Sequence, residues 1–357
     1  MGPGPFAAMM LADLGAEVLR IGRLDEDVDA VTIDLMNRGK KSVALDLKSV
    51  EGREAVLEYA TRADVLIEGF RPGVLERLGI GPEVVLAVNP RLIYGRITGW
   101  GHGGSLSAAA GHDINFISLT GALHTIGSAG GPPVPPLAFV GDFGGGAMSL
   151  AFGIVAALCE TQQSALGQIV EASIVDGAAV LTMTVRNLFN AGLWQDERGV
   201  NLFDGGAPFY SVYETRDGKY ISVGAYEPRF FANLLEALDL DQAALPRQFD
   251  RDGWPELRAA LATTFLGGTR DEWCARLEGT ETCFAPVLSM TEAPLHPQNR
   301  ARDAFANVDG KLVPAPTPRF RRSGTVTPRA MKTHSRSDPE IITTWGEPAQ
   351  QPIMEDL

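Results

Sequence analysis

Residues 63–97 read ADVLIEGFRPGVLERLGIGPEVVLAVNPRLIYGRI, and this stretch decides the fold class. Val65–Glu68 is a short apolar run that ends on an acid and a glycine, which predicts a strand. Pro82–Val88 has the character of a helix, and Leu92–Ile97 predicts a second strand. A strand, a helix and another strand in succession are typical of a mostly parallel sheet that is flanked by helices.

The same alternation continues on both sides of this stretch. Helices are predicted at 6–14, 46–62, 144–163 and 175–188, and strands at 17–21, 42–46 and 168–172. The chain begins on the turn Gly2-Pro-Gly-Pro5, although a doubly wound sheet usually begins with a strand that leads into such a turn. We therefore expect an α/β fold whose first strand is missing from this chain.

The pattern changes after about residue 190. A segment rich in Gly, Asn and Asp is followed by a predicted hairpin, Phe209–Thr215 and Lys219–Val223, then by three helices and a strand, Phe284–Leu288. Pro286 indicates that this last strand is an edge strand or an irregular one. We expect a large domain from 1–188 and 300–345, a linker at 189–208, and a small α+β domain at 209–299.

Composition narrows the function. The chain of 357 residues has a formal net charge of −13, which argues against non-specific binding to nucleic acid. Three scattered cysteines form no CxxC pair, so we expect no disulfide framework, no metal site and a cytoplasmic location. No uninterrupted apolar run reaches about 18 residues, which predicts no membrane span.

Gly111-His-Asp-Ile-Asn115 is the strongest local signal for chemistry, because it precedes an apolar segment, Phe116–Leu123, that predicts a helix. A histidine is an acid or base near neutral pH, and the free N–H groups of a helix start stabilise a developing oxyanion. The alternative is structural, with Asp113 as the helix cap and His112 as a satisfied polar neighbour. The residues alone leave both interpretations open.

Val140-Gly-Asp-Phe-Gly-Gly-Gly146 is the second signal. Three glycines before an apolar helix allow the backbone to approach a ligand closely, and Asp142 stands just before them. The alternative is again a capping aspartate at a flexible turn. The loop lacks the Lys-Ser/Thr pair of a phosphate-binding P-loop.

Basic side chains gather in the first hundred residues of this acidic chain, several of them beside strand ends, where phosphate-bearing ligands bind in doubly wound folds. They are Arg23, Arg38, Lys40, Lys41, Lys48, Arg71, Arg77 and Arg96. Each one taken alone is most simply a solvated surface charge. Glu227, at a strand end before a helix, is most simply a first-turn acid that the helix dipole favours.

Several motifs, in order along the chain, together resemble the family III CoA-transferase superfamily and, within it, the α-methylacyl-CoA racemases. They are Gly2-Pro-Gly-Pro-Phe-Ala-Ala8, Leu11-Ala-Asp-Leu-Gly-Ala-Glu-Val18, Asn37-Arg-Gly-Lys-Lys-Ser42, Leu45-Asp-Leu-Lys48, Ala63-Asp-Val-Leu-Ile-Glu-Gly-Phe-Arg-Pro-Gly73, Ile97-Thr-Gly-Trp-Gly101, and the two motifs around His112 and Asp142.

The resemblance implies a Rossmann-like large domain built from both chain ends, a smaller domain between them, and an interlocked homodimer. It implies an acyl-CoA substrate and no separate cofactor. His112 and Asp142 would be two opposed bases, Glu227 would support His112, and the backbone N–H of Asp113 would lie near the thioester oxygen. The CoA-binding positions carried over are Arg23, Lys48, Gly69, Phe70, Arg71 and Arg77.

Three activities follow from this resemblance. A racemase would move the α-proton of a 2-methylacyl-CoA through an enolate. A CoA transferase would instead use Asp142 as a nucleophile towards the acyl group. His112 favours the racemase, because acyl transfer moves no α-proton. The third is a non-catalytic CoA-binding homologue, which the missing strand suggests.

Overall fold

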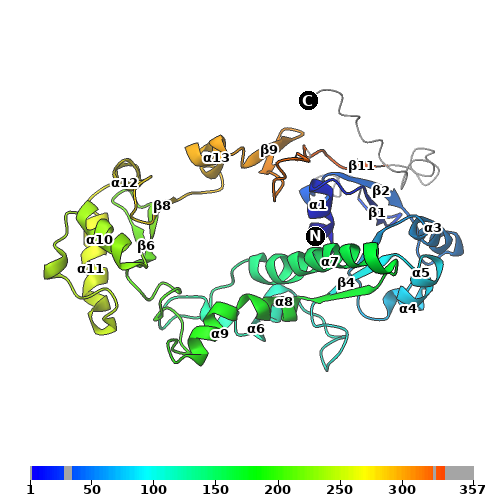
Figure 1. The fold of residues 1–357 in the computed structure, drawn as a ribbon, viewed down its shortest axis with the longest axis horizontal. Helices are drawn as coiled ribbons and strands as arrows, with labels where there is room; N and C mark the ends of the chain where they lie inside the picture. Colours follow the sequence, from blue (N-terminus) through cyan, green and yellow to red (C-terminus); the bar gives the residue numbers. More distant parts are fainter. Residues whose placement is uncertain (1, 28–33, 325–326, 334–357) are drawn as a thin grey trace. The chain divides into compact units, whose positions relative to one another are not determined.

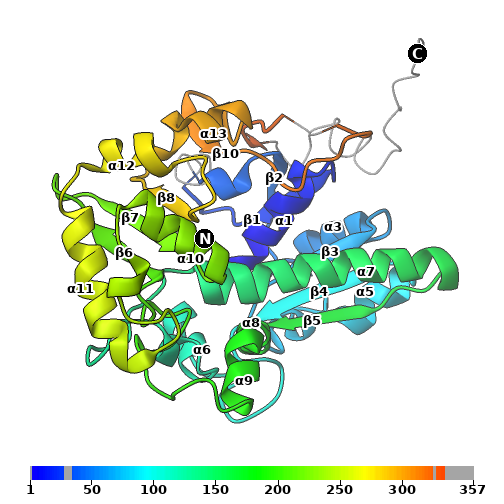
Figure 2. The ribbon, with the colours of Figure 1, turned by 60° about the vertical axis from the view of Figure 1, so that its left-hand side comes forward.

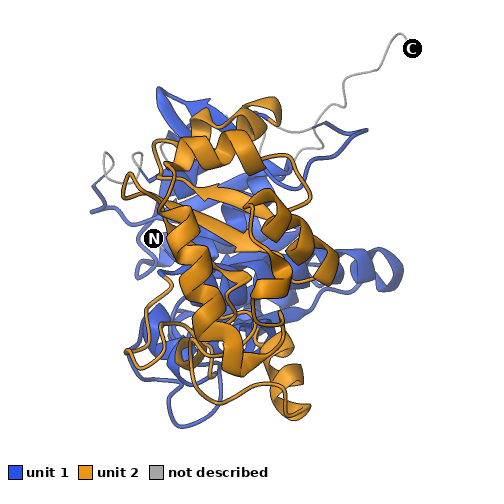
Figure 3. Cartoon of the chain, turned by 90° about the vertical axis from the view of Figure 1, so that its left-hand side faces the viewer, with its two compact units in different colours: residues 1–120, 137–181, 303–357 blue, residues 121–136, 182–302 orange. Residues whose placement is uncertain are grey.

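The computed structural model describes residues 2–27, 34–324 and 327–333. The chain divides into two compact units, which are coloured separately in Figure 3. Unit 1 comprises residues 1–120, 137–181 and 303–357, and unit 2 comprises 121–136 and 182–302.

This division differs from the predicted domain boundaries, because 121–136 and the whole of the predicted linker, 189–208, belong to unit 2. The physical reason lies in Arg198. Its guanidinium donates hydrogen bonds to the carbonyls of His124 (2.8 Å) and Gly131 (2.8 Å), which ties the two segments together. Contacts of this kind between distant segments leave no mark in local composition.

Unit 1 has the mixed α/β character that the alternating pattern predicts (Figure 1). Its described part contains two three-stranded parallel sheets, ordered β1-β2-β11 and β3-β4-β5, and the hairpin β9-β10. The strands are β1 (Val18–Gly22), β2 (Lys40–Ala44), β3 (Val65–Glu68), β4 (Ile93–Thr98), β5 (Ile169–Ser173), β9 (Phe305–Val308), β10 (Lys311–Pro314) and β11 (Lys332–Thr333).

The helical segments of unit 1 connect these strands. They are α1 (Pro3–Asp13), η1 (Leu35–Asn37), α3 (Val50–Ala60), α4 (Val74–Arg77), α5 (Pro82–Val88), α6 (Asp113–Ser118), the π-helix η3 (Phe139–Ala147), α7 (Met148–Ser164) and α8 (Ile174–Leu181). The strand β3 and the helix α5 have the bounds that the sequence predicts.

Strand β4 is buried on both faces. Ile93 and Ile97 pack with α7 in one apolar cluster, whereas Tyr94 packs with residues of α3 and α5 in another. At Gly95 an added Cβ would lie 3.0 Å from Ile154 Cδ1, so α7 lies close against the strand. Helices on both faces are what a near-continuous apolar strand requires.

Helix α1 contacts both β1 and β3, and each of these strands lies at an edge of its own sheet. Two buried cations hold the helix. Arg38 pairs with Asp13 at its last turn (2.5 Å), and Lys40 Nζ donates to the carbonyl of Pro5 (2.9 Å). Gly2 is the N-cap, so among the described residues no strand precedes α1.

The long apolar helix begins earlier than predicted. The expectation was a helix over 144–163 that opens with glycines, but the helical segment starts as η3 at Phe139 and becomes α7 at Met148. The predicted helix 175–188 is likewise two helices, α8 and α9 (Met183–Asn190). Glycine runs indicate loops, and this signal hid the π-helical start.

By length and composition, the segment Phe139–Ser164 could cross a membrane, with a mean hydropathy of 1.5. The core helix of a globular domain meets the same criterion. One face of α7 is such a core face, because Leu150, Ile154 and Ala157 are buried in the core of unit 1. The expectation that nothing spans a membrane stays a prediction.

Unit 2 is a three-stranded antiparallel sheet with helices (Figure 2). The predicted hairpin is confirmed as β6 (Tyr210–Glu214) and β7 (Tyr220–Gly224), and β8 (Phe284–Val287) is an edge strand as predicted. The helical segments are η2 (Leu123–Thr125), α9, α10 (Pro228–Ala237), η4 (Gln242–Ala244), η5 (Arg251–Gly253), α11 (Trp254–Phe265), α12 (Arg270–Leu277), η6 (Ala293–Leu295) and α13 (Pro297–Ala301).

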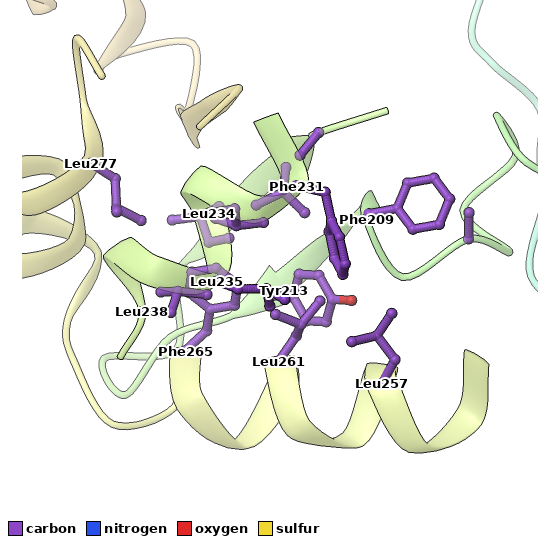
Figure 4. Close-up of a cluster of buried hydrophobic side chains, with 14 of the residues drawn as sticks. Phe209, Tyr213, Phe231, Leu234, Leu235, Leu238, Leu257, Leu261, Phe265 and Leu277 are labelled. Carbon is purple, nitrogen blue, oxygen red and sulfur yellow. The ribbon is translucent and has the colours of Figure 1, made fainter. Parts of the chain in front are cut away.

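The core of unit 2 is rich in aromatic side chains (Figure 4). Phe209, Phe231 and Phe265 are almost fully buried. Tyr213, buried with them, donates its hydroxyl to the carbonyl of Pro208 (2.6 Å), as a buried tyrosine must find a partner.

Candidate active site

His112 is the N-cap of the short helix α6, so the structural alternative that made Asp113 the cap is wrong. The backbone N–H of His112 donates to Asn115 Oδ1 (3.1 Å), and its side chain is exposed. The loop before it is fixed by Phe116, whose ring stacks edge-on against Trp100 at 4.7 Å. An added Cβ at Gly111 would lie 2.7 Å from the Phe116 ring, so a glycine is needed here.

Asp142 lies within η3, four residues into the π-helix, and is not a capping residue in front of a helix. Its side chain is half-buried, and its Oδ1 atom is buried without a hydrogen-bond partner in the described parts of the chain. A buried carboxyl oxygen with no partner is rare in folded proteins and calls for a functional explanation. π-Helical turns are also frequent at functional sites.

A hydrogen bond joins the two motifs. The backbone N–H of Asp142 donates to Asp113 Oδ1 at 2.7 Å, across 29 residues of sequence. This contact brings the N-cap of α6 to the start of η3. His112, the residue before Asp113, therefore lies near Asp142 and affects its carboxyl, so the two residues that the sequence singles out form one candidate site.

The surroundings raise the pKa of the Asp142 carboxyl above its ordinary value. Burial is the largest cause, the Asp113 carboxylate adds to it, and His112 acts in the opposite sense. A carboxylic acid that keeps its proton to higher pH is suited to protonate a substrate carbon. The pair can thus supply one acid and one base.

The glycines after Asp142 pack against helix α8, and the predicted approach of their backbone to a ligand stays a prediction. A Cβ at Gly145 would lie 2.5 Å from the backbone nitrogen of Ala178, and a Cβ at Gly177 would overlap the carbonyl of Gly145. Helix α8 therefore lies directly against η3. This packing supports the backbone that carries Asp142.

Glu227 is the exposed N-cap of α10 in unit 2 and makes no cap hydrogen bond with its side chain. The structural interpretation made it a first-turn acid; it lies one position earlier. Its support of His112 stays a prediction.

The expected CoA-binding residues lie in unit 1 after the carboxyl ends of parallel strands. Arg23 follows β1, Lys48 follows β2, and the loop Gly69-Phe70-Arg71 follows β3. All of them are exposed, as is Arg77 at the end of α4. The carboxylate of Asp25 pairs with Arg23 at 2.6 Å. Arg23 and, more weakly, Lys48 lower the pKa of Asp25, so this acid interacts with both cations.

The other cations are committed to partners within the chain. Arg38 and Lys40 anchor α1, and Lys41 pairs with Glu17 (2.7 Å). Arg96 is buried and bridges Glu68 (3.4 Å) and Glu76 (2.6 Å). Sequence position alone does not separate these cations from the exposed ones.

Glu68 also shapes the loop after β3. Its second carboxylate oxygen accepts the backbone N–H of Phe70 at 2.7 Å, while Arg96 connects it to α4 through Glu76. The network fixes the loop 69–71 relative to the helix that ends at Arg77. Sequence reasoning missed this role, although an acid at a strand end before glycine is a usable signal.

The sequence also gave His102 no role. Its Nδ1 atom lies 2.5 Å from Glu171 Oε1, and burial and the neighbouring Arg96 lower the pKa of the imidazole.

Among the residues described, no group of three His, Cys, Asp or Glu side chains could hold a metal ion.

Comparison with known proteins shows the family of the chain. Residues 1–339 match CoA-transferase family III. The chain is 45% identical over 318 residues to the alpha-methylacyl-CoA racemase of Mus musculus (89% of this chain, 82% of the relative). It is 42% identical over 319 residues to that of Homo sapiens (89% and 83%).

A solved structure shares the fold. The CAIB/BAIF family protein from Brucella suis superposes with a TM-score of 0.78 over 91% of both chains, at 24% identity. With most of the chain matched in sequence and in fold, this protein belongs to CoA-transferase family III.

Proposed function

We propose that the protein is an isomerase that epimerises the 2-position of 2-methylacyl-CoA thioesters, with His112 and Asp142 as the proton-transfer pair. The observation that carries this proposal is the half-buried Asp142 carboxyl, whose pKa is raised, beside the histidine at the start of α6. The identity with racemases over most of the chain supports the same reaction.

The α-hydrogen of a thioester is a weak acid, so its removal leaves an enolate that needs stabilisation. In one direction neutral His112 takes the proton from one face and protonated Asp142 returns a proton to the same carbon from the other; the reverse direction exchanges the roles. The backbone N–H of Asp113, the first residue of α6, is one of the free donors that suit the enolate oxygen. Glu227 would orient His112.

For CoA, the exposed cations Arg23, Lys48, Arg71 and Arg77 would meet the phosphates. Gly69 and Phe70 would contact the rest of the CoA moiety of the substrate. No separate cofactor is required, because CoA is part of the substrate. We place the reaction in the cytoplasm.

The Rossmann-like large domain and the interlocked homodimer are part of this proposal. Exposed apolar side chains on η3 and on the two helices that contact it, α7 and α8, support a second copy as their cover: Phe139, Met148, Phe152, Val155, Val180 and Leu181. Light scattering during gel filtration would give twice the chain mass for a homodimer.

CoA transfer with Asp142 as the nucleophile is the second candidate, since the unpaired Asp142 Oδ1 atom would serve it. The raised pKa argues against it, because a nucleophile needs the ionised carboxylate. His112 has no task in acyl transfer.

Incubation with one epimer of a 2-methylacyl-CoA in deuterated water, without an acceptor acid, separates these activities. The racemase incorporates α-deuterium and loses stereochemical purity. A transferase shows no exchange and leaves an acyl group on Asp142 that hydroxylamine traps. A folded protein that does neither would be the non-catalytic homologue.

A further inference from the structure

The side chain of Asp113 makes an unexpected contact. An acid in the first turn of a helix usually faces the N–H groups of its own helix. Asp113 instead accepts the backbone N–H of Asp142 on η3, at 2.7 Å. The contact joins the first residue of one helix to the start of another.

The start of η3 accommodates the Asp113 carboxylate. Phe143 makes the first backbone bond of the π-helix, to the carbonyl of Ala138, so the N–H of Asp142 has no helical partner of its own. Gly141 leaves the room, because a Cβ there would overlap Asp113 Oδ1. The N–H of Asp142 needs an acceptor, and Gly141 leaves space for one, so both features suit an acid at position 113.

The same carboxylate acts on Asp142 through its charge. Of the groups that affect the Asp142 carboxyl, Asp113 favours the protonated form and His112 the ionised one. The other charged groups on elements packed against η3 have partners of their own: Asp13 with Arg38, Arg96 with Glu76, Glu160 with Gln168, Glu171 with His102, and Asp176 with Ser173.

We propose that the Asp113 side chain is a positioning residue, which holds the main chain of Asp142 in place and, through its negative charge, keeps the Asp142 carboxyl ready to donate a proton. This inference rests on the proposed racemase reaction and goes beyond it, because that reaction assigns Asp113 only a backbone N–H. The side chain of Asp113, unlike its backbone N–H, acts through Asp142, whose backbone N–H it accepts.

Two substitutions separate the hydrogen bond from the charge. Asp113→Asn keeps an oxygen acceptor of the same shape and loses the charge, whereas Asp113→Ala loses both. Glu83→Gln is the matched control, because Glu83 is an exposed first-turn acid on α5, away from the site. Circular dichroism checks that all three variants fold.

The first measurement is the pH profile of kcat/KM for epimerisation. In Asp113→Asn the limb of the profile that follows the ionisation of Asp142 moves to lower pH, because loss of the neighbouring charge lets Asp142 ionise more easily. In Asp113→Ala, kcat falls by about 100-fold with little change in KM, as expected when a reacting group loses its position. Glu83→Gln matches the wild type.

The second measurement does not need activity. Carbon-13 spectra of aspartate-labelled protein, with the Asp142 signal assigned by its loss in Asp142→Asn, follow the titration of that carboxyl. The expected result is a lower pKa of Asp142 in Asp113→Asn than in the wild type. If this pKa is unchanged and Asp113→Ala keeps the wild-type kcat, the inference is wrong. A shifted titration in a protein without α-proton exchange would overturn the racemase reaction and retain the effect of Asp113 on Asp142.

Discussion

The α6–η3 region and the loops that follow β1, β2 and β3 both carry charged side chains in unit 1, in opposite surroundings. In the first, Asp142 is half-buried and has a raised pKa, and no described residue is a hydrogen-bond partner of its Oδ1 atom. In the second, Arg23, Lys48 and Arg71 are exposed, as is Arg77 at the end of the following helix, α4. Proton transfer needs a perturbed acid, which burial provides, whereas phosphate binding needs accessible cations whose charge is constant.

Replacing the buried acid should have the largest effect. We expect Asp142→Asn to reduce epimerisation by about 1,000-fold, because general acid–base groups contribute roughly 100- to 10,000-fold. Chiral chromatography of the acyl product would measure this loss. Asp176→Asn, on α8 against the same π-helix, should retain most of the activity. Equal losses in both variants would mean that Asp142 acts through structure alone.

A buried cation offers a test by pH. Burial is the main cause that lowers the pKa of Lys40 to about 8. The unfolded chain, with the ordinary pKa of lysine, binds a proton more tightly between pH 8 and about 10.5. Stability should therefore rise with pH in that window, by about 3 kcal/mol. Urea unfolding at pH 7 and at pH 10 measures the increase in unfolding free energy. In Lys40→Met, the part of this increase that Lys40 contributes should be missing. An identical increase in the variant and the wild type would contradict the prediction.

The support beneath Asp142 should be intolerant of a single methyl group. Gly145→Ala places a Cβ against the backbone of Ala178, so we expect a loss of about 2 kcal/mol in unfolding free energy, which is typical of overpacking. Thermal unfolding would measure it. Gly103→Ala is the control, because no atom of the described residues lies within 4 Å of its added Cβ. If both variants melt like the wild type, the contact between η3 and α8 is looser than described.

The exposed cations should give the smallest effect. We expect Arg77→Ala to raise KM for the CoA ester by about tenfold with kcat unchanged, the size of one charged hydrogen bond. Arg91→Ala, at the amino-terminal end of β4, should leave KM as it is. A change in kcat in Arg77→Ala would mean that this cation influences the reacting groups, which would remove the distinction between the two regions.

Much of the fold could be predicted from local patterns. The strand β3 and the helix α5 have the predicted bounds, because each combines clear apolar spacing with a glycine or proline at its end. Proline in β8 correctly indicated an edge strand. The π-helical start of the long helix could not be predicted, since Gly144-Gly-Gly146 indicates a loop unless the neighbouring α8 is known.

The candidate site was harder to predict. His112 and Asp142 stood out by residue type, but nothing in the sequence links position 113 to position 142, and the tertiary hydrogen bond between them is what joins the motifs. Arg96 and Arg23 both lie at or near a predicted strand end, so the sequence does not distinguish them. The structure does, because Arg96 is buried and pairs with Glu68 and Glu76, whereas Arg23 is exposed. The role of Glu227 stays a prediction.

The π-helix has a consequence for chain length. An α-helix advances by about 100° for each residue, and a π-turn includes one residue more within each hydrogen-bonded loop. Residues 139–147 therefore set the rotational phase of Asp142 independently of α7, whose buried stripe at Leu150 and Ile154 is fixed by the core. Deleting one residue between Asp142 and Met148 would rotate the carboxyl about the helix axis while that stripe stayed in register. The direction in which the acid faces is thus encoded by a single-residue difference in length.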